Sequence, residues 1–439
     1  MDPTHDPSLT SWVESANVAG DFPIQNLPFG VFRRRDEDDP GSVGIAIGDM
    51  ILDVTACHDE GRFTGLAERA AEACAAPALN ALMRLGGDAR ADLRWQVSAL
   101  LSGASPAYRS NRRLGDRILV AMSEAEMLLP AEIGEYTDFY ASVHHATNVG
   151  SMFRPDNPLL PNYKWVPIGY HGRSSSIVPS GTAVARPSGQ SKAPDAEVPA
   201  FGPTRSLDYE MELGLFVGTG NTAGEPVPIE RAEAHIFGFC LVNDWSARDI
   251  QAWEYQPLGP FLSKNFATTI SPWVVTPEAL QPFRAPALAR PADDPAPLPY
   301  LDSPTNSAAG AVAVTVEVHL STGRMREQGL QPVRLSRGSA ADLYWTPAQL
   351  VAHHTSNGCN LRPGDLLASG TISGPARDSR GCLLELTWRG AEPLTVPGGE
   401  TRKFLEDGDE VIMRGYCEGE GAVRIGFGEC RGRVEPAKR

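Results

Sequence analysis

Residues 207–218 read LDYEMELGLFVG, and their alternation of side-chain types decides how this chain folds. Successive side chains of a β-strand point to opposite faces, so Asp208, Glu210 and Glu212 share one face and the apolar or aromatic residues between them share the other. One interpretation is an edge strand with a solvated acidic face. In the other, carboxylates about 6.5–7 Å apart converge on a hard divalent cation that screens their repulsion. Spacing alone leaves both interpretations open.

Similar strand patterns recur from Asp138 to the end of the chain, separated by Gly- and Pro-rich turns. They are SIVPSG (176–181), LGLFVG (213–218), AVAVTVEVHL (311–320), CLLELTW (382–388), DEVIMRGYCEG (409–419) and VRIGFGECRGRV (423–434). Many short strands of this kind predict a mainly β domain, within an α+β chain. The polar, Pro- and Ala-rich segment from Phe283 to Ser307 is expected to be a surface loop or arm.

The first part of the chain has a different pattern. VGIAIGDMILDVT (43–55) predicts a hairpin that turns at Gly48-Asp49, and the Ala- and Leu-rich residues 66–86 have helical spacing. A chain of 439 residues is long enough for two domains. We therefore expect a small mixed domain over residues 1–130 and a larger one over 131–439.

Composition narrows the classes of function. The net charge of -15 disfavours nucleic acid and anionic lipid as partners. No segment approaches the ~18 apolar residues of a membrane helix, and the polar start of the chain lacks the apolar core of a signal peptide. The seven cysteines contain no CxxC pair, which favours a reduced cytoplasmic protein. Neither a phosphate-binding glycine loop nor a GxSxG elbow occurs.

A second candidate region runs from His235 to Tyr255, where an apolar run ends at Asp244 and a helical pattern follows. Carboxylates at the carboxyl end of a strand often lie in sites. Arg248, Gln251 and Tyr255 follow helical spacing and would share one helix face. Alternatively, Asp244 only caps the helix and Arg248 is its surface ion-pair partner.

Two further segments carry polar residues in apolar surroundings. Lys264 either extends its amine to solvent or is held as a charge for an anion. Thr371 lies in a Gly-rich segment whose glycines either form turns or let the backbone approach a ligand. The adjacent His353 and His354 have no carboxylate close by in the sequence, and we interpret them as packing residues.

The segment DFYASVHHATNVGSMFR (138–154) places a carboxylate near two adjacent histidines. If it is helical, Asp138 and His145 lie two turns apart on one face, and His144 points about 100° away. Histidine ordinarily titrates near neutral pH, so one close to a cation but not bound to it suits a general base. The alternative is a buried packing histidine.

Six segments together carry a resemblance to a known family. They are DFPIQNLPFGVF (21–32), YTDFYASVHHATNVGSMFR (136–154), VPIGYHGRSSSIV (166–178), LDYEMELGLFVG (207–218), NDWSARDIQAWEYQPLGPFLSKNFATTISPWVV (243–275) and NGCNLRPGDLLASGTISG (357–374). In this order they closely resemble the fumarylacetoacetate hydrolase family, including an N-terminal domain that its shorter members lack. The resemblance implies a small N-terminal SH3-like barrel, a large β-rich catalytic domain and a cytoplasmic homodimer.

The resemblance also implies an activity. It is the metal-dependent hydrolysis of a carbon–carbon bond in a small β-diketo acid, giving fumarate and acetoacetate in the last step of tyrosine and phenylalanine degradation, with Ca²⁺ or Mg²⁺. An alternative within the superfamily is a hydrolase of acylpyruvates or other β-diketones. A second alternative is a catalytically inactive binding protein of this fold.

Site residues follow from the matching motif positions. The resemblance implies cation ligands at Asp138, Glu210, Glu212 and Asp244, with Lys264 and Thr268 at positions associated with a second ion. It implies a base at His145, a glutamate that orients it at Glu385 of GCLLELTW, and stabilisers of negative charge at Arg248, Gln251 and Lys264. It implies substrate-binding residues at Tyr140, Arg154, Tyr170, Gln251, Tyr255 and Thr371. His144 stands where the family pattern has glutamine.

Overall fold

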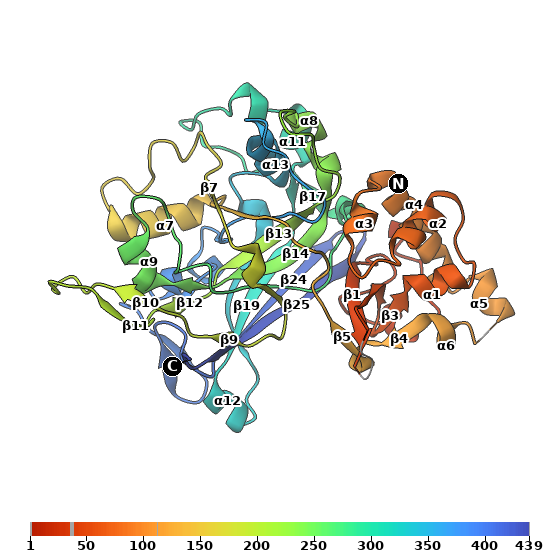
Figure 1. Ribbon diagram of the computed structural model, residues 1–439, viewed down its shortest axis with the longest axis horizontal. Coiled ribbons are helices and arrows are strands. Elements are labelled where there is room, and N and C mark those ends of the chain that lie inside the picture. The colour runs from red at the N-terminus through yellow and green to blue at the C-terminus, as the bar shows by residue number, and fades with distance from the viewer. Residues whose placement is uncertain (1, 36–38, 112, 439) are drawn as a thin grey trace.

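The computed structural model describes residues 2–35, 39–111 and 113–438. A smaller N-terminal part, red to orange in Figure 1, lies beside a larger part that runs from yellow to blue. No helix within these described ranges is long and apolar enough to cross a membrane. All seven cysteines are free thiols, and only Cys359 is exposed.

The N-terminal part is built on a five-stranded antiparallel sheet. Its order is β4 (Leu119–Ala121), β3 (Met50–Asp53), β2 (Ser42–Ile47), β1 (Phe29–Arg34) and β5 (Ala125–Met127). The hairpin expected at Gly48-Asp49 is confirmed, since Ile47 pairs with Met50 and Gly48 takes a φ of 59°. The α-helices of its described residues are α1 (Val54–Asp59), α2 (Gly65–Ala73), α3 (Asn80–Met83), α4 (Gly87–Leu101), α5 (Pro106–Ser110) and α6 (Gly115–Ile118).

A seven-stranded mixed sheet forms the centre of the larger part. Its order is β7 (Gly169–His171), β6 (Tyr136–Phe139), β21 (Leu366–Ala368), β13 (Met211–Val217), β14 (Ile236–Asp244), β16 (Thr268–Ile270) and β8 (Ile177–Pro179). The β6–β21 and β16–β8 pairs are parallel and the other pairs are antiparallel. Because β13 and β14 are buried along their whole length, this sheet has protein on both faces.

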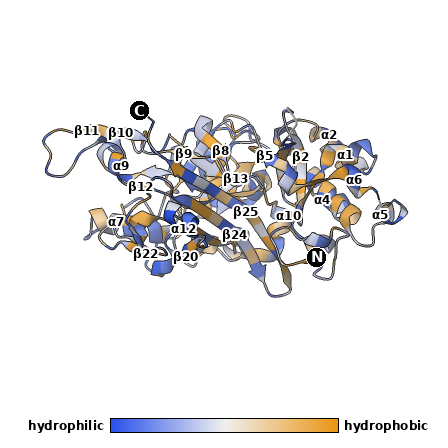
Figure 2. Ribbon diagram, turned by 90° about the horizontal axis from the view of Figure 1, so that it is seen from below, coloured by the Kyte–Doolittle hydropathy of each residue, from blue (hydrophilic) through white to orange (hydrophobic). Residues whose placement is uncertain are grey.

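A five-stranded sheet packs against the seven-stranded one. Its order is β20 (Val333–Ser339), β19 (Thr315–Ser321), β24 (Glu410–Gly419), β25 (Ala422–Glu435) and β9 (Val184–Ala185). Hydrophilic and hydrophobic residues alternate along β24 and β25, as Figure 2 shows. Glycine leaves room for neighbouring side chains at two positions of the five-stranded sheet. A Cβ at Gly432 would lie 2.6 Å from the Trp245 ring, and one at Gly415 would lie 2.6 Å from Leu241 of β14.

The remaining elements surround these sheets. Four two-stranded ladders are β10–β11 (Ser188–Ser191 and Ala200–Pro203), β12–β15 (Leu207–Asp208 and Ser246–Ala247), β17–β18 (Arg284–Ala285 and Ala311–Val312) and β22–β23 (Leu394–Val396 and Glu400–Arg402). The helices are α7 (Val143–Phe153), α8 (Ile229–Ala232), α9 (Arg248–Glu254), α10 (Pro277–Leu280), α11 (Pro304–Ala309), α12 (Gly323–Glu327), α13 (Pro347–Thr355) and α14 (Leu383–Leu386). The β10–β11 hairpin projects from the body as an arm (Figures 1 and 2).

The hydrophobic cores join the two parts of the chain. One cluster combines N-terminal residues such as Ile45 and Leu93 with Phe216, Phe237 and Val242 of the seven-stranded sheet. A second fills the space between the two large sheets. The predicted fold class, a small N-terminal part followed by a large β-rich part, is confirmed.

Two local predictions are wrong, and a third is incomplete. The segment 138–154 is not one helix. Asp138 lies in the strand β6, and the helix α7 begins only at Val143, so the argument from helical spacing fails. CLLELTW was expected to be a strand, but its residues 383–386 form the short helix α14. All four helical residues are buried by the rest of the fold, so their apolar character does not indicate a strand. The Phe283–Ser307 segment is not only a surface loop, because it includes β17 and part of α11 and buries Leu301.

Candidate functional site

Four buried carboxylates converge at one end of the seven-stranded sheet. Asp138 comes from β6, Glu212 from β13 and Asp244 from the end of β14, while Glu210 precedes β13. One oxygen from each carboxylate lies within 4.8 Å of the others. All four side chains are buried, so the interpretation of residues 207–218 as a solvated acidic face is wrong.

Two cations partly neutralise this group. Lys264 Nζ lies 2.8 Å from Glu210 Oε2 and 2.7 Å from Asp244 Oδ2, and Arg248 Nη1 lies 2.6 Å from Glu210 Oε1. Burial opposes the charge of Lys264, but the neighbouring carboxylates outweigh it and raise the pKa of Lys264 above its ordinary value. Lys264 therefore does not extend to solvent. It is a buried charge held by two acids.

The remaining pair of carboxylates has the properties of a cation site. Asp138 Oδ1 and Glu212 Oε1 are buried and have no hydrogen-bond partner among the described residues. Burial and the neighbouring acids raise the pKa of both carboxyl groups well above the ordinary range. Unpartnered buried oxygens are costly unless something binds them. An all-oxygen donor set of this kind fits a hard divalent cation.

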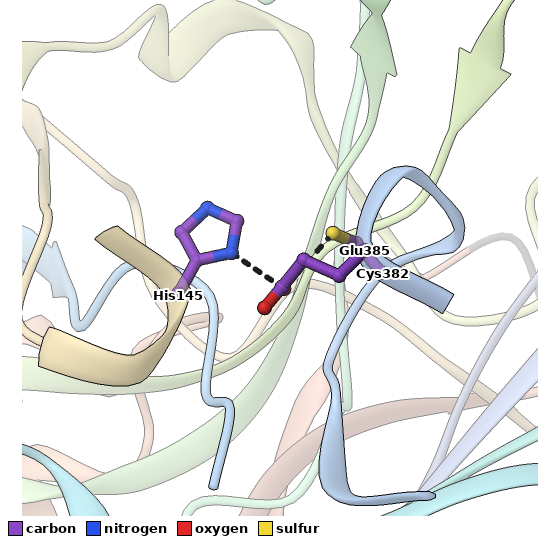
Figure 3. Close-up of side chains that lie close together, drawn as sticks. All are labelled: His145, Cys382 and Glu385. Carbon is purple, nitrogen blue, oxygen red and sulfur yellow. Dashed lines mark hydrogen bonds and ion pairs between the residues drawn. The ribbon is translucent and has the colours of Figure 1, made fainter. Parts of the chain in front are cut away.

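His145 and Glu385 form a buried pair beside the carboxylates. His145 Nδ1 lies 2.6 Å from Glu385 Oε2, and the second ring nitrogen faces away from Glu385 (Figure 3). Since a carboxylate only accepts, Nδ1 of the neutral ring carries the proton and Nε2 keeps its lone pair. The edge of the Tyr140 ring packs against the imidazole, with the centroids 5.3 Å apart.

Four donors fix the Glu385 carboxylate. Besides His145, they are Asn148 Nδ2 at 2.7 Å, Ser373 Oγ at 2.8 Å and Cys382 Sγ at 3.2 Å. Burial acts to raise the pKa of Glu385, but the His145 ring and the hydrogen bonds from Asn148 and Ser373 outweigh it and lower the pKa to about 2. Glu385 is therefore held ionised in one orientation.

This lowered pKa predicts a stability difference that depends on pH. A carboxyl group whose pKa is lower in the folded state stabilises the fold above its unfolded pKa, and that stability is lost as the pH falls. The quantity to measure is the free energy of unfolding of the wild type minus that of Glu385→Gln. We expect this difference to fall by about 2 kcal/mol when the pH is lowered from 5 to 3. Urea unfolding at both values measures it. Glu230→Gln, at an exposed site on α8, is the control. A difference for Glu385→Gln that stays constant with pH would contradict the prediction.

Of the three predicted face residues of helix α9, Arg248 contacts the carboxylate Glu210, and Gln251 contacts Arg248. Arg248 Nη1 donates to Gln251 Oε1 at 3.2 Å, while Arg248 Nη2 is buried without a partner in the described part of the chain. Tyr255 lies just beyond the end of α9 and is 40% exposed. The alternative role of Asp244 as the helix cap is wrong, because the N-cap is Ala247.

The other predicted residues lie in three different settings. Tyr170 and Thr268 join the carboxylates, donating to Asp244 at 2.8 Å and 2.9 Å. Thr371 is buried, and its hydroxyl has no partner within the described residues. Arg154 is not brought into this group, because its exposed guanidinium donates to the Pro158 carbonyl.

Several residues in contact with the site were not predicted. Asn148 follows His145 by three residues. This spacing indicates a shared helix face, but only once residues 143–153 are known to be helical. Ser373 lies two residues after Thr371 in the same Gly-rich segment. Asp208 was noted only as a member of the acidic strand face, yet it contacts Arg248 and not the other carboxylates.

Comparison with known proteins gives consistent matches over nearly the whole chain. Residues 25–130 match the family model described as fumarylacetoacetase N-terminal, and residues 135–435 match fumarylacetoacetate hydrolase C-terminal. The chain is 50% identical over 421 residues to the fumarylacetoacetase of Bos taurus, covering 95% of this chain and 97% of that protein. It is 52% identical over 422 residues to that of Caenorhabditis elegans, with the same coverage.

A solved structure shows the same fold at lower sequence identity. The fumarylacetoacetate hydrolase of Exiguobacterium antarcticum superposes with a TM-score of 0.51 at 18% identity, covering 94% of this chain and all of that one. The two family models, in the order of the sequence, and the relatives at about half identity agree with each other. The chain belongs to the fumarylacetoacetase family.

Proposed function

We propose that this protein hydrolyses the carbon–carbon bond of 4-fumarylacetoacetate, giving fumarate and acetoacetate. The observation that carries the proposal is the convergence of four buried carboxylates beside the His145–Glu385 pair. Relatives named fumarylacetoacetase, at about half identity and full coverage, support this substrate. The protein is thus a hydrolase acting on a ketonic carbon–carbon bond.

His145 activates the attacking water in this proposal. With Nδ1–H held by Glu385, the free Nε2 takes a proton from water as the oxygen attacks the substrate carbonyl carbon. Glu385 stays ionised and stabilises the imidazolium that forms. The bond between the attacked carbon and the adjacent methylene then breaks. The methylene takes the proton back from Nε2–H of His145, which restores the neutral ring as acetoacetate leaves.

Preorganised positive charge stabilises the electrons that the broken bond releases. We assign this role to Arg248, Gln251 and Lys264. Arg248 and Lys264 both contact Glu210, Gln251 accepts from Arg248, and Nη2 of Arg248 is an available donor. A divalent cation held by Asp138 and Glu212, with Glu210 and Asp244, would supply a Lewis acid for the substrate carbonyl oxygens. We propose that Tyr140, Tyr170 and Thr371 orient the substrate.

Finer features belong to the same proposal. We propose Ca²⁺ or Mg²⁺ as the cation, Lys264 and Thr268 as contacts of a second ion, and substrate contacts from Arg154 and Tyr255. We place the domain boundary between residues 130 and 131, which the two separate family matches support. We also propose a cytoplasmic setting and the last step of tyrosine and phenylalanine degradation.

A homodimer completes the proposal. Large apolar side chains are unusually exposed on the β10–β11 arm and on the loop after α9, where Phe201 is 76%, Leu258 96% and Phe261 67% exposed. Exposed apolar groups of this size are typical of protein interfaces. Light scattering of the purified protein tests this, and a monomer at micromolar concentration would contradict it.

A direct assay on two substrates tests the activity. We expect cleavage of fumarylacetoacetate to be at least about tenfold more efficient, in kcat/KM, than cleavage of acylpyruvates. The reverse preference would favour the related acylpyruvate hydrolases. No turnover of either substrate would favour an inactive binding protein of this fold.

Removal of divalent cations should abolish turnover. We expect a chelator followed by buffer exchange to lower kcat by at least about 100-fold, because the carboxylates alone cannot polarise a carbonyl. Adding Mg²⁺ or Ca²⁺ back should restore it, and thermal melts with and without chelator check that the chain stays folded. Turnover that persists after chelation, with no bound metal by elemental analysis, would contradict the prediction.

A further inference from the structure

Asp208 is a fully buried carboxylate that the proposed mechanism does not use. It is 0% exposed and lies on β12, two residues before Glu210. Although it shares the alternating acidic pattern with Glu210 and Glu212, it is not part of the converging carboxylate group. Its two oxygens instead accept four hydrogen bonds from three different segments.

The first partner is Arg248 on α9. Arg248 Nε donates to Asp208 Oδ2 at 2.9 Å, while Nη1 contacts Glu210 at 2.6 Å. Two of the three guanidinium nitrogens are thus fixed, which sets the plane of the group. The third, Nη2, is the buried donor left without a partner in the described structure, and so it is available to a ligand.

The second partner is the start of α14. The backbone N–H of Leu383 donates to Asp208 Oδ1 at 2.8 Å, and that of Leu384 donates to Oδ2 at 3.0 Å. Glu385 is the next residue and contacts His145 at 2.6 Å. The Asp208 carboxylate therefore fixes the backbone that carries the partner of the base.

We propose that Asp208 is a positioning residue that holds Arg248 and Glu385 in a fixed relation to each other. The inference rests on the proposed function, in which one of these groups stabilises charge and the other orients the base. A displacement of about 1 Å in such groups can cost about 100-fold in rate. The Asp208 carboxylate contacts both α9 and α14, so it prevents such a displacement of Arg248 and of Glu385.

The variant Asp208→Asn tests the proposal. It keeps the size of the side chain but turns an amide N–H₂ toward two of the four donors, so Arg248 or α14 is released. We expect kcat to fall about 10- to 100-fold, with KM changed by less than about threefold. A purely structural residue would lower the amount of folded enzyme and leave the kcat of the folded fraction unchanged.

A double-mutant cycle separates positioning from an independent effect. In Arg248→Met the group that Asp208 holds is already absent, so adding Asp208→Asn should cost less than it costs the wild type. Additive losses in kcat would overturn the coupling to Arg248. If Asp208→Asn does not fold, Asp208→Glu keeps the charge but shifts the carboxylate by one methylene, and a wild-type kcat in that variant would overturn the proposal.

Asp409 offers a matched control. It is also 0% exposed and also holds an arginine, accepting from Arg402 Nε at 2.8 Å, together with the backbone N–H of Glu406. Asp409→Asn should lower thermal stability and leave kcat at the wild-type value. Wild-type kcat in Asp208→Asn would overturn the inference alone, whereas an inactive wild-type enzyme in the same assay would overturn the proposed function.

Discussion

Replacing His145 with alanine is expected to lower kcat for fumarylacetoacetate by about 10²–10⁴-fold, the usual contribution of a general base. The ring is buried, its Nδ1 is held by Glu385, and its Nε2 is left as the acceptor for a proton from water. KM should change little, because this nitrogen acts on the water and not on the bound substrate. Steady-state kinetics on protein saturated with Mg²⁺ measure both quantities.

The neighbouring histidine supplies the control for this variant. His144 is on the same helix α7, is half-buried, and makes no contact with Glu385 among the described hydrogen bonds. His144→Ala should keep kcat within about threefold of the wild type, since it removes the same ring without touching the base. Thermal melts show whether each variant is folded. A kcat in folded His145→Ala close to that of the wild type would exclude His145 as the base.

The strand at residues 211–217 shows how far the sequence alone leads. Alternation predicted both the strand and the shared face of Glu210 and Glu212. It could not tell a solvated face from a buried one, because that depends on which strands pair on either side. Asp138 lies on β6 and Asp244 on β14, and β21 and β13 lie between these two strands in the sheet. The two carboxylates therefore come close only when the whole sheet has formed. The pairing, and hence the burial, is a long-range property.

Local helix signals were less informative near the base. Ser142 caps α7 by accepting a hydrogen bond from the His145 N–H. Residues before Ser142 form the strand β6, but their sequence does not clearly show that the helix begins only at Val143. The Asp138–His145 relation was therefore explained by the wrong geometry. For Glu385, only the resemblance pointed to a function. Its short helix α14 depends on contacts from Asp208, which is remote in sequence.

Glu212→Gln is expected to change stability in opposite directions with and without a cation. Burial and the neighbouring Asp138 and Asp244 raise the pKa of Glu212 well above its ordinary value. A carboxyl group with a raised folded pKa opposes folding at neutral pH, where the unfolded chain ionises it freely. Without a cation, the neutral glutamine should therefore increase the free energy of unfolding by about 1 kcal/mol or more.

With a saturating cation the order should reverse. The wild type gains about 3 kcal/mol when the cation is present at about 100 times its Kd. Removing one carboxylate ligand should weaken cation binding at least about 100-fold, since even outer contacts of a metal site are worth about 10- to 100-fold, so the variant gains little. Isothermal titration with Mg²⁺ or Mn²⁺ and thermal melts with and without chelator measure both effects.

The opposite signs separate a cation site from a merely structural acid. Glu278→Gln is the matched control, because Glu278 is a largely buried carboxylate whose pKa is lowered, against the effect of burial, by Arg90 at 2.7 Å. Its replacement leaves the Arg90 charge without this carboxylate, so stability should fall by a similar amount in both conditions. If Glu212→Gln behaves like Glu278→Gln, the four carboxylates do not hold a cation. The expected result is that Glu212→Gln is more stable than the wild type without a cation and less stable with one, and that Glu278→Gln shows no such reversal. This reversal requires that a bound divalent ion relieves the repulsion among the four acids.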